Sequence, residues 1–246
     1  MRHRRRPIAS PLGLTSRLGL SRLLVSSAVL LSGAAGCRSV GTSDARADRA
    51  EVKQGAAAAP ATRRNVGTDP GGVGNGTPLA PRPGHELAVF AGGCFWGTED
   101  VFRQVPGVTA TAVGYTGGQK ANPTYEEVCG HGTGHAESVL VEFDPKVVSY
   151  DDLLRIFLMN HDPTTPNRQG PDVGSQYRSA IFTFSEGQAS AARRAIESEQ
   201  KRIGRPIVTQ VGTIGPFWKA EAYHQQYDEK TGTHSCPLPK GLRAGT

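Results

Sequence analysis

The chain has 246 residues, with 28 Lys and Arg, 22 Asp and Glu, and a formal net charge of +6. The basic excess lies at one end: residues 1–85 hold 13 Lys and Arg against 4 Asp and Glu, whereas residues 86–246 hold 15 against 18. A basic patch binds nucleic acid only from a folded face, and this excess lies in a leader that is not expected to fold. Composition therefore argues against a nucleic-acid-binding protein and leaves residues 86–246 as one domain of ordinary size.

The first 37 residues have the pattern of an export signal. An arginine-rich start precedes a short apolar run at residues 23–31, which is too short to cross a bilayer as a helix. The following SGAAGC resembles the lipobox of bacterial lipoproteins, with Ala34 where those usually have Leu, and it ends at Cys37. Two outcomes stay open: lipidation of Cys37, or ordinary signal-peptidase cleavage after a small residue. Either outcome predicts a mature protein outside the cytoplasm, in the periplasm or cell envelope and possibly lipid-anchored.

Residues 38–85 are rich in Ala, Gly, Pro and Arg and show no apolar periodicity. A stretch of this composition buries too little apolar surface to offset the entropy of ordering it. We therefore predict a disordered linker over residues 38–85, which would tether the domain to a membrane if Cys37 is acylated.

The domain itself alternates between predicted strands and helices. The strands are expected at residues 87–91, 108–115, 136–143, 178–184 and 206–214, and the helices at 94–105, 150–161, 185–203 and 220–230. This order contains a split βαβ pattern and predicts an α+β sheet with helices on one face. Two long polar segments, 116–134 and 162–177, lack periodicity; loops of that length are usually functional.

Cys94 is the strongest candidate for chemistry. It follows a predicted strand and the pair Gly92-Gly93, and it stands at the start of a predicted helix. Unpaired backbone N–H groups and the positive end of the helix dipole favour the thiolate there. The bulky pair Phe95 and Trp96 could line a small apolar pocket beside the sulfur. The alternatives are an inert buried thiol and ordinary core packing of the aromatic residues.

Four polar residues of the loops and strand ends could serve this thiol. Tyr125, Glu137, Asp172 and Tyr177 would supply two phenols and two carboxyls. Reduction of an S=O bond requires a nucleophile at sulfur and proton donors at the departing oxygen, which this set provides. Taken singly, each residue also has a structural interpretation, as a surface acid, a turn residue or a half-buried tyrosine.

The motifs as an ordered set resemble one enzyme family. AGGCFWG, GYTGG, NPTYEEVC, TGHAESV, HDPTT, DVGSQYRS and HQQY follow one another between about residue 87 and residue 236. This series is similar to the peptide methionine sulfoxide reductases of the A type. The resemblance implies a ferredoxin-like α+β fold and reduction of methionine S-sulfoxide, free or in proteins, without a metal or an organic cofactor. It thereby assigns residues 86–246 to a peptide methionine sulfoxide reductase domain that acts in protein repair.

The resemblance also implies a role for each residue. Cys94 matches the nucleophile, which becomes a sulfenic acid, and Glu137 matches the acid that protonates the sulfoxide oxygen. Tyr125 and Tyr177 match the phenols that hydrogen-bond that oxygen, and Asp172 matches an acid that organises the site. The pocket for the ε-methyl group of the substrate is matched by Phe95 and Trp96.

Cys236 is expected to resolve the sulfenic acid. It lies in a tail rich in Gly and Pro, nine residues after Tyr227, at the spacing where similar enzymes carry a resolving cysteine. No cysteine follows it. We therefore expect a disulfide between Cys94 and Cys236 that an external thioredoxin-like dithiol reduces, in a protein that acts as a monomer.

Two other classes of protein would fit part of the sequence. Cys129, His131 and His135 have spacing like that of metal ligands, which would suit a metal-binding lipoprotein. That hypothesis needs a fourth ligand and leaves the ordered motifs unexplained, so Cys129 is expected to be structural. A catalytically silent module that binds methionine side chains is the other alternative, and the intact Cys94, Glu137 and Tyr177 argue against it.

Overall fold

A computed structural model describes residues 65–233 of the chain. The predictions for the leader, for Cys37 and for Cys236 lie outside the described residues. Within residues 65–233, no helix combines the length and the apolar character needed to cross a membrane.

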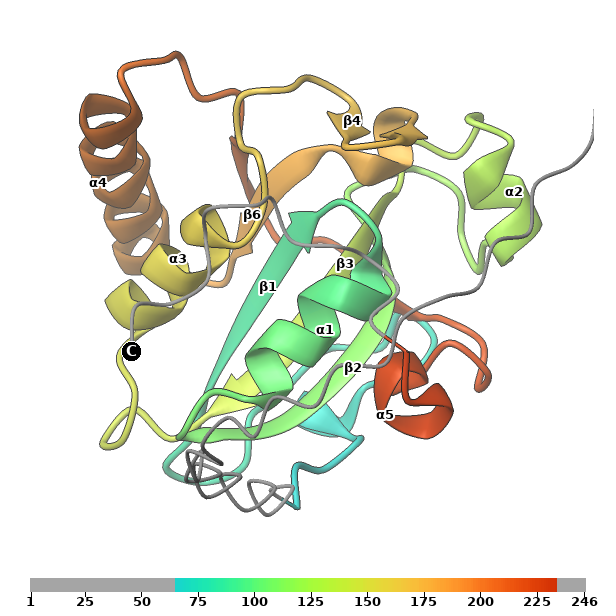
Figure 1. Ribbon diagram of the computed structural model, residues 1–246. Coiled ribbons are helices and arrows are strands. Elements are labelled where there is room, and N and C mark those ends of the chain that lie inside the picture. The colour runs from blue at the N-terminus through green and yellow to red at the C-terminus, as the bar shows by residue number, and fades with distance from the viewer. Residues whose placement is uncertain (1–64, 234–246) are drawn as a thin grey trace, which may run out of the picture. The chain divides into compact units, whose positions relative to one another are not determined.

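A six-stranded mixed sheet forms the centre of the described part, with α-helices packed on it (Figure 1). The strand order is β7-β6-β1-β3-β2-β8, in which only the β6–β7 pair is parallel. The strands are β1 Glu86–Gly92, β2 Val108–Thr116, β3 Ala136–Phe143, β6 Ser179–Thr183, β7 Gln210–Thr213 and β8 Trp218–Lys219. The five longer strands agree in place with the predicted ones. The two-residue edge strand β8 was not predicted, because two residues carry no periodicity.

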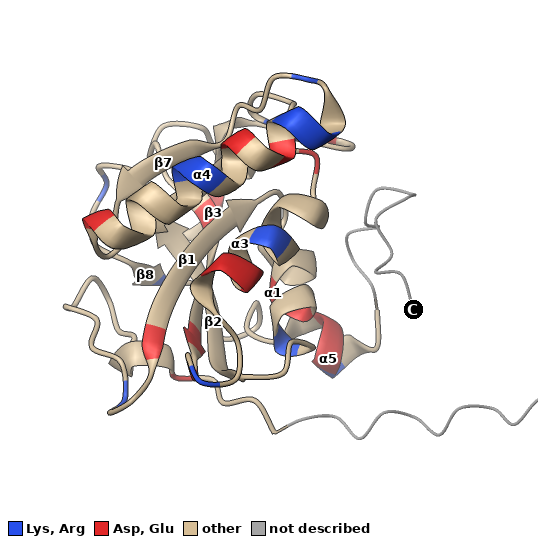
Figure 2. Ribbon diagram, turned by 90° about the vertical axis from the view of Figure 1, so that its left-hand side faces the viewer, with Lys and Arg blue, Asp and Glu red and all other residues tan. Residues whose placement is uncertain are grey.

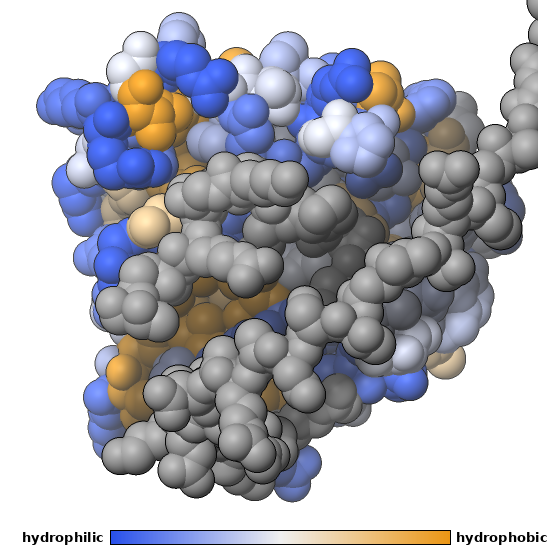
Figure 3. Space-filling view, viewed as in Figure 1, coloured by the Kyte–Doolittle hydropathy of each residue, from blue (hydrophilic) through white to orange (hydrophobic). Residues whose placement is uncertain are grey.

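Three helices cover one face of the sheet, as the α+β prediction required. Helices α1 (Phe95–Arg103), α3 (Tyr150–Met159) and α4 (Glu186–Ile203) contribute to one apolar cluster with β1, β2 and β3. In the space-filling view, hydrophobic surface is seen on the face where α1 and α3 lie (Figure 3). The outer side of α4 carries acidic and basic residues (Figure 2). The buried residues of this helix are three alanines and Glu199.

The opposite face is covered by irregular segments, and this overturns part of the linker prediction. Residues 65–85 were predicted to be disordered, yet Val66 and Val73 are buried, and Gly67 forms a bridge with Ala110 of β2. The backbone N–H of Gly71, in a short 3-10 helix (Pro70–Gly72), donates to Glu142 of β3 at 2.7 Å. We call residues 65–85 the N-terminal strap.

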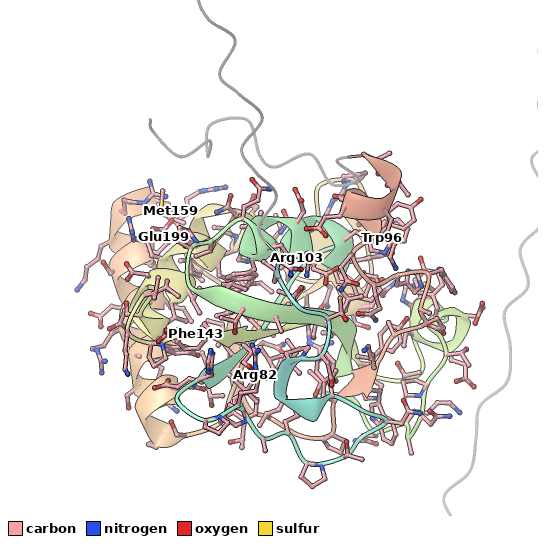
Figure 4. All side chains as sticks on the ribbon, turned by 90° about the horizontal axis from the view of Figure 1, so that it is seen from below. Arg82, Trp96, Arg103, Phe143, Met159 and Glu199 are labelled. Atoms are coloured by element: carbon pink, nitrogen blue, oxygen red, sulfur yellow. The ribbon has the colours of Figure 1, made fainter. Side chains whose placement is uncertain are left out.

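The strap escaped prediction because hydrogen bonds and single apolar anchors fix it, and a sequence pattern shows neither. Arg82 of the strap pairs with the same buried carboxylate, Glu142. Arg82 and Arg103 are labelled in Figure 4, where the ribbon of the strap passes the sheet between them. The folded part of the described chain therefore includes residues 65–85 and does not begin at residue 86.

The two long loops contain short elements that position polar side chains. The first loop holds α2 (Tyr125–Cys129), and the second holds the two-stranded hairpin β4 (Arg168–Gln169) and β5 (Asp172–Val173). A 3-10 helix, η2 (Ser175–Tyr177), follows the hairpin. The last helix, α5 (Tyr227–Thr231), is shorter than the predicted helix over residues 220–230.

Candidate active site

Cys94 is the N-cap residue of α1, with non-helical φ and ψ of −55° and 124°. The residue is partly exposed at the N-terminus of the helix, the setting that favours a thiolate. The strand-to-helix turn depends on Gly93, whose φ is 98°, and a Cβ there would lie 2.5 Å from Cγ of Gln169. The predicted arrangement of strand, glycine pair, cysteine and helix is thus confirmed.

A buried histidine supports this turn from behind. A Cβ on Gly92 would lie 3.2 Å from Cγ of His161, so the imidazole occupies the space beside the turn. Burial lowers the pKa of His161 to about 4, which leaves the ring neutral at ordinary pH. Its Nδ1 lies 2.8 Å from the carbonyl oxygen of Phe157, and its Nε2 lies 2.7 Å from Oγ of Ser179.

Glu137 stands beside Cys94 at the start of β3. Its side chain is 2% exposed, and its Oε2 accepts a hydrogen bond of 3.1 Å from the backbone N–H of Phe95. Burial raises the pKa of this carboxyl well above its ordinary value, and the neighbouring Cys94 and Asp172 raise it further. A carboxyl held in its protonated form next to a thiol can donate a proton to a group that the thiol attacks.

Two tyrosines and an aspartate approach the same point from the two long loops. Burial is the largest cause of the raised pKa of Tyr125 and of Tyr177, so both phenols keep their protons. Tyr125, Tyr177 and Asp172 each interact electrostatically with Glu137. The structure therefore brings together all five residues that were predicted to be catalytic.

The aromatic pair after Cys94 divides into a core residue and a partly buried one. Phe95 is 1% exposed and contacts Tyr115 and His224 with ring centroids 5.9 and 5.1 Å apart. Trp96 stacks on Tyr227 at the start of α5, with centroids 3.9 Å apart and planes inclined by 10°, and Figure 4 shows it beside that helix. Its indole N–H donates to Nδ1 of His224 at 3.1 Å.

Sequence reasoning missed the roles of three residues near the motif HQQY. His224 and Tyr227 fix the Trp96 ring, as described above. Glu221 accepts hydrogen bonds from the backbone N–H of Tyr125 at 2.9 Å and from the hydroxyl of Tyr115 at 3.0 Å. The motif was itself the available signal, because it places an imidazole and a phenol three residues apart.

The histidines weighed as metal ligands have other partners. Nδ1 of His135 accepts from the backbone N–H of Gly118 at 3.1 Å, and its Nε2 lies 2.7 Å from the carbonyl of Lys120. His131 interacts with Gln176. The pKa of the Cys129 thiol is raised, chiefly by burial. Among residues 65–233, no three His, Cys, Asp or Glu residues cluster as metal ligands would.

Taken together, these residues form a candidate site for cysteine-dependent redox chemistry. A family model described as peptide methionine sulfoxide reductase matches residues 86–243. The chain belongs to the peptide methionine sulfoxide reductase family, as the ordered motifs predicted. As a member of that family it is an enzyme of the peptide-methionine (S)-S-oxide reductase class.

Individual relatives agree with this assignment. The peptide methionine sulfoxide reductase MsrA of Geobacter sulfurreducens is 57% identical over 153 residues, which are 61% of this chain and 94% of that protein. The enzyme of the same name from Methanosarcina acetivorans is 58% identical over 154 residues, covering 62% and 82% of the two chains.

Solved structures extend the likeness to the fold. Methionine sulfoxide reductase A of Corynebacterium diphtheriae matches with a TM-score of 0.61 and 36% identity, over 76% of this chain and 93% of that chain. Reduced Mxr1 from Saccharomyces cerevisiae matches with a TM-score of 0.60 and 34% identity, over 66% and 93%.

Proposed function

We propose that this enzyme reduces the S epimer of methionine sulfoxide, free or within proteins, with Cys94 as the nucleophile and Glu137 as the acid. The observation that carries the proposal is the position of the Glu137 carboxyl. It is buried, its pKa is raised, and it is fixed by the N–H of Phe95, the residue directly after Cys94. An acid with these properties can donate a proton to an oxygen on the sulfur that Cys94 attacks.

The first step transfers oxygen from the substrate to the enzyme. The Cys94 sulfur attacks the sulfoxide sulfur while Glu137 protonates the sulfoxide oxygen, and the phenols of Tyr125 and Tyr177 donate hydrogen bonds to that oxygen. The attack joins the Cys94 sulfur to the substrate sulfur while the S–O bond breaks and the protonated oxygen leaves as water. A water molecule then attacks the Cys94 sulfur, the bond between the two sulfurs breaks, methionine leaves, and Cys94 is left as sulfenic acid, so that one oxygen is transferred in net. The partly buried Trp96, next to the core residue Phe95, would receive the ε-methyl group. Burial would keep the carboxyl of Glu137 protonated, and the negative charge of Asp172 would add to this effect.

The second step returns the enzyme to its thiol form. The Cys236 thiol displaces water from the sulfenic acid and forms a disulfide with Cys94, and a thioredoxin-like dithiol then reduces this disulfide by exchange. Two thiols and an external dithiol balance the electrons, so no prosthetic cofactor is needed.

For the setting of the reaction, we propose that residues 1–37 direct export, with lipidation of Cys37 as one outcome, and that the monomeric enzyme repairs exported proteins in the periplasm or cell envelope. The patterns of the leader support this. The mass of the mature N-terminus tests it: a lipid-modified Cys37 means anchoring, a cut after a small residue means release, and an intact Met1 overturns export.

For the fold, we propose the ferredoxin-like type within the larger sheet. The support is the antiparallel order β6-β1-β3-β2, in which α1 connects β1 to β2 and α3 lies between β3 and β6 along the chain.

The proposed reaction is tested with the full chain and the S sulfoxide of N-acetylmethionine, using dithiothreitol as reductant. We expect turnover by the wild type and none by Cys94→Ser. A well-folded wild type that forms no sulfide would overturn the proposal.

The resolving step has a separate test. Cys236→Ser should reduce one equivalent of sulfoxide and then fail to recycle with thioredoxin. Recycling by that variant would show that Cys129 or direct reduction of the sulfenic acid serves in place of Cys236.

A further inference from the structure

The two phenols of the site stand on separate loops, so something must fix one loop against the other. Tyr125 opens α2 in the first loop, and Tyr177 closes η2 in the second. They can donate to one oxygen only if these loops keep a fixed separation.

Hydrogen bonds on both sides of Tyr177 connect it to the segment that follows α2. On one side, Oε1 of Gln176 lies 3.0 Å from Nδ1 of His131. On the other side, Nη2 of Arg178 donates to the carbonyl of Gly134 at 3.1 Å. Residues 131–134 thus hold the neighbours of Tyr177 from two points.

The His131 contact is built at a cost to the backbone. His131 has a φ of 65°, a left-handed conformation that disfavours a residue with a Cβ by about 1 kcal/mol or more. Such strain persists where the surroundings require the side chain. Gln176 is 3% exposed, so its amide requires a partner, and its oxygen can only accept.

The imidazole also lies directly against the turn that leads to Tyr177. A Cβ on Gly174 would lie 2.6 Å from Cε1 of His131 and 2.2 Å from Oε1 of Gln176, so the turn approaches the ring as closely as a glycine permits. With the Gln176 oxygen as acceptor, Nδ1 of His131 carries the proton of the hydrogen bond.

We propose that His131 is a positioning residue, which holds the Tyr177 turn against the loop of Tyr125 so that both phenols reach the same sulfoxide oxygen. This rests on the proposed roles of the two tyrosines. His131 touches no reacting atom. It affects the rate of the first step and does not affect the affinity for the substrate, which depends on the aromatic pocket.

The test measures single-turnover reduction of N-acetylmethionine S-sulfoxide by the reduced full chain, so that recycling does not contribute. His131→Gly should lower the limiting rate about tenfold, within the range known for coupled contacts, and change the half-saturating substrate concentration less than twofold. Its thermal midpoint should change little, because glycine accepts the positive φ without strain and this gain offsets the loss of a partner for the buried Gln176 amide. The matched control is Asn122→Gly, which replaces another positive-φ residue (46°) of the same loop and should keep the wild-type rate.

A second variant, Gln176→Leu, measures the coupling between His131 and Gln176 in a double-mutant cycle. The double variant His131→Gly with Gln176→Leu should be no slower than the slower single variant, because both changes break one contact. The inference is overturned if His131→Gly keeps the wild-type rate, if its loss lies in substrate affinity, or if Asn122→Gly is equally slow. An inactive wild type would overturn the proposed function itself, which separates the two failures.

Discussion

Glu137 lies on β3 with 2% of its surface exposed, and its raised pKa connects catalysis to stability at the scale of one residue. Because this pKa is higher in the folded than in the unfolded chain, the folded state binds the proton more tightly. The stabilisation is complete below the ordinary pKa of a carboxyl and is lost as the pH rises through the raised pKa. As the pH rises above the ordinary pKa of a carboxyl, Glu137 therefore lowers the free energy of unfolding relative to a side chain that cannot ionise.

Glu137→Gln should remove this cost and the activity together. The amide oxygen can still accept from the N–H of Phe95, but it cannot ionise, so we expect the free energy of unfolding at pH 8 to rise. The rate of the first step should fall at least ~100-fold, as expected on loss of a general acid. Urea unfolding at pH 8 and pH 4.5 measures the difference, which should shrink at the lower pH. If the difference in the free energy of unfolding between Glu137→Gln and the wild type is the same at pH 8 and pH 4.5, the pKa of Glu137 is not raised.

Asp172 offers a test of the same carboxyl through its charge. Burial and Cys94 are the larger causes of the raised pKa of Glu137, and the charge of Asp172 adds to them. Asp172→Asn should therefore lower the pKa of Glu137, and the decline of the first-step rate at alkaline pH should move to lower pH. The control is Asp144→Asn, which follows β3 at the end opposite Glu137. A pH profile of Asp172→Asn that coincides with the wild-type profile would exclude the electrostatic role.

At the scale of elements, α2 shows how a five-residue helix can present Tyr125. A helix this short is unstable alone. Its N-cap Thr124 accepts from the N–H of Glu127 at 3.4 Å, and the Glu127 carboxylate accepts from the N–H of Thr124 at 3.0 Å, which completes a capping box. Glu221 accepts the N–H of Tyr125, so α2 is fixed at its first turn.

Thr124→Ala should therefore lower activity more than global stability. Loss of an N-cap costs about 1 kcal/mol, here confined to α2, and we expect the first-step rate to fall severalfold while amide exchange within α2 accelerates. The control is Ser149→Ala, which removes the same kind of capping box from α3. That variant should lose about 1 kcal/mol of global stability and keep its rate. The opposite pattern would show that α2 does not need its cap to place Tyr125.

At this scale, the sequence predicts those features that depend on residues close together in the chain. Periodicity located α1 and α3, and a cysteine after two glycines located the N-terminus of α1. The capping box of α2 was readable as Thr124 to Glu127, yet the loop assignment overlooked it. The contact between His131 and Gln176 joins positions 45 residues apart, and no local pattern encodes it.

The N-terminal strap shows the same limit at the scale of the whole molecule. Its contacts with Glu142 and Arg103 come from partners that are distant in sequence, so the segment has the composition of a linker although it packs as part of the fold. Residues 65–85 also precede the region that the family model matches.

Arg103 connects the beginning and the end of the described chain. Its guanidinium, which is buried, donates to the carbonyls of Val66 and Gly67 at 3.0 and 3.1 Å. It also forms a two-point ion pair with Glu229 of α5, at 2.8 and 2.9 Å. One side chain thus fixes the strap and α5 to the end of α1, and a compact ammonium could not reproduce this planar set of donors.

Arg103→Lys should loosen both segments at once. The charge is kept while most of the hydrogen bonds are lost, and we expect the free energy of unfolding to fall by about 2 kcal/mol, the cost of leaving buried acceptors without a donor. Amide exchange should accelerate together in the strap and in α5. Arg193→Lys, in an exposed pair with Glu186 on α4, serves as the control and should change stability by less than about 1 kcal/mol. Acceleration confined to one segment would show that the strap and α5 are anchored independently, and that Arg103 does not couple the two ends of the domain.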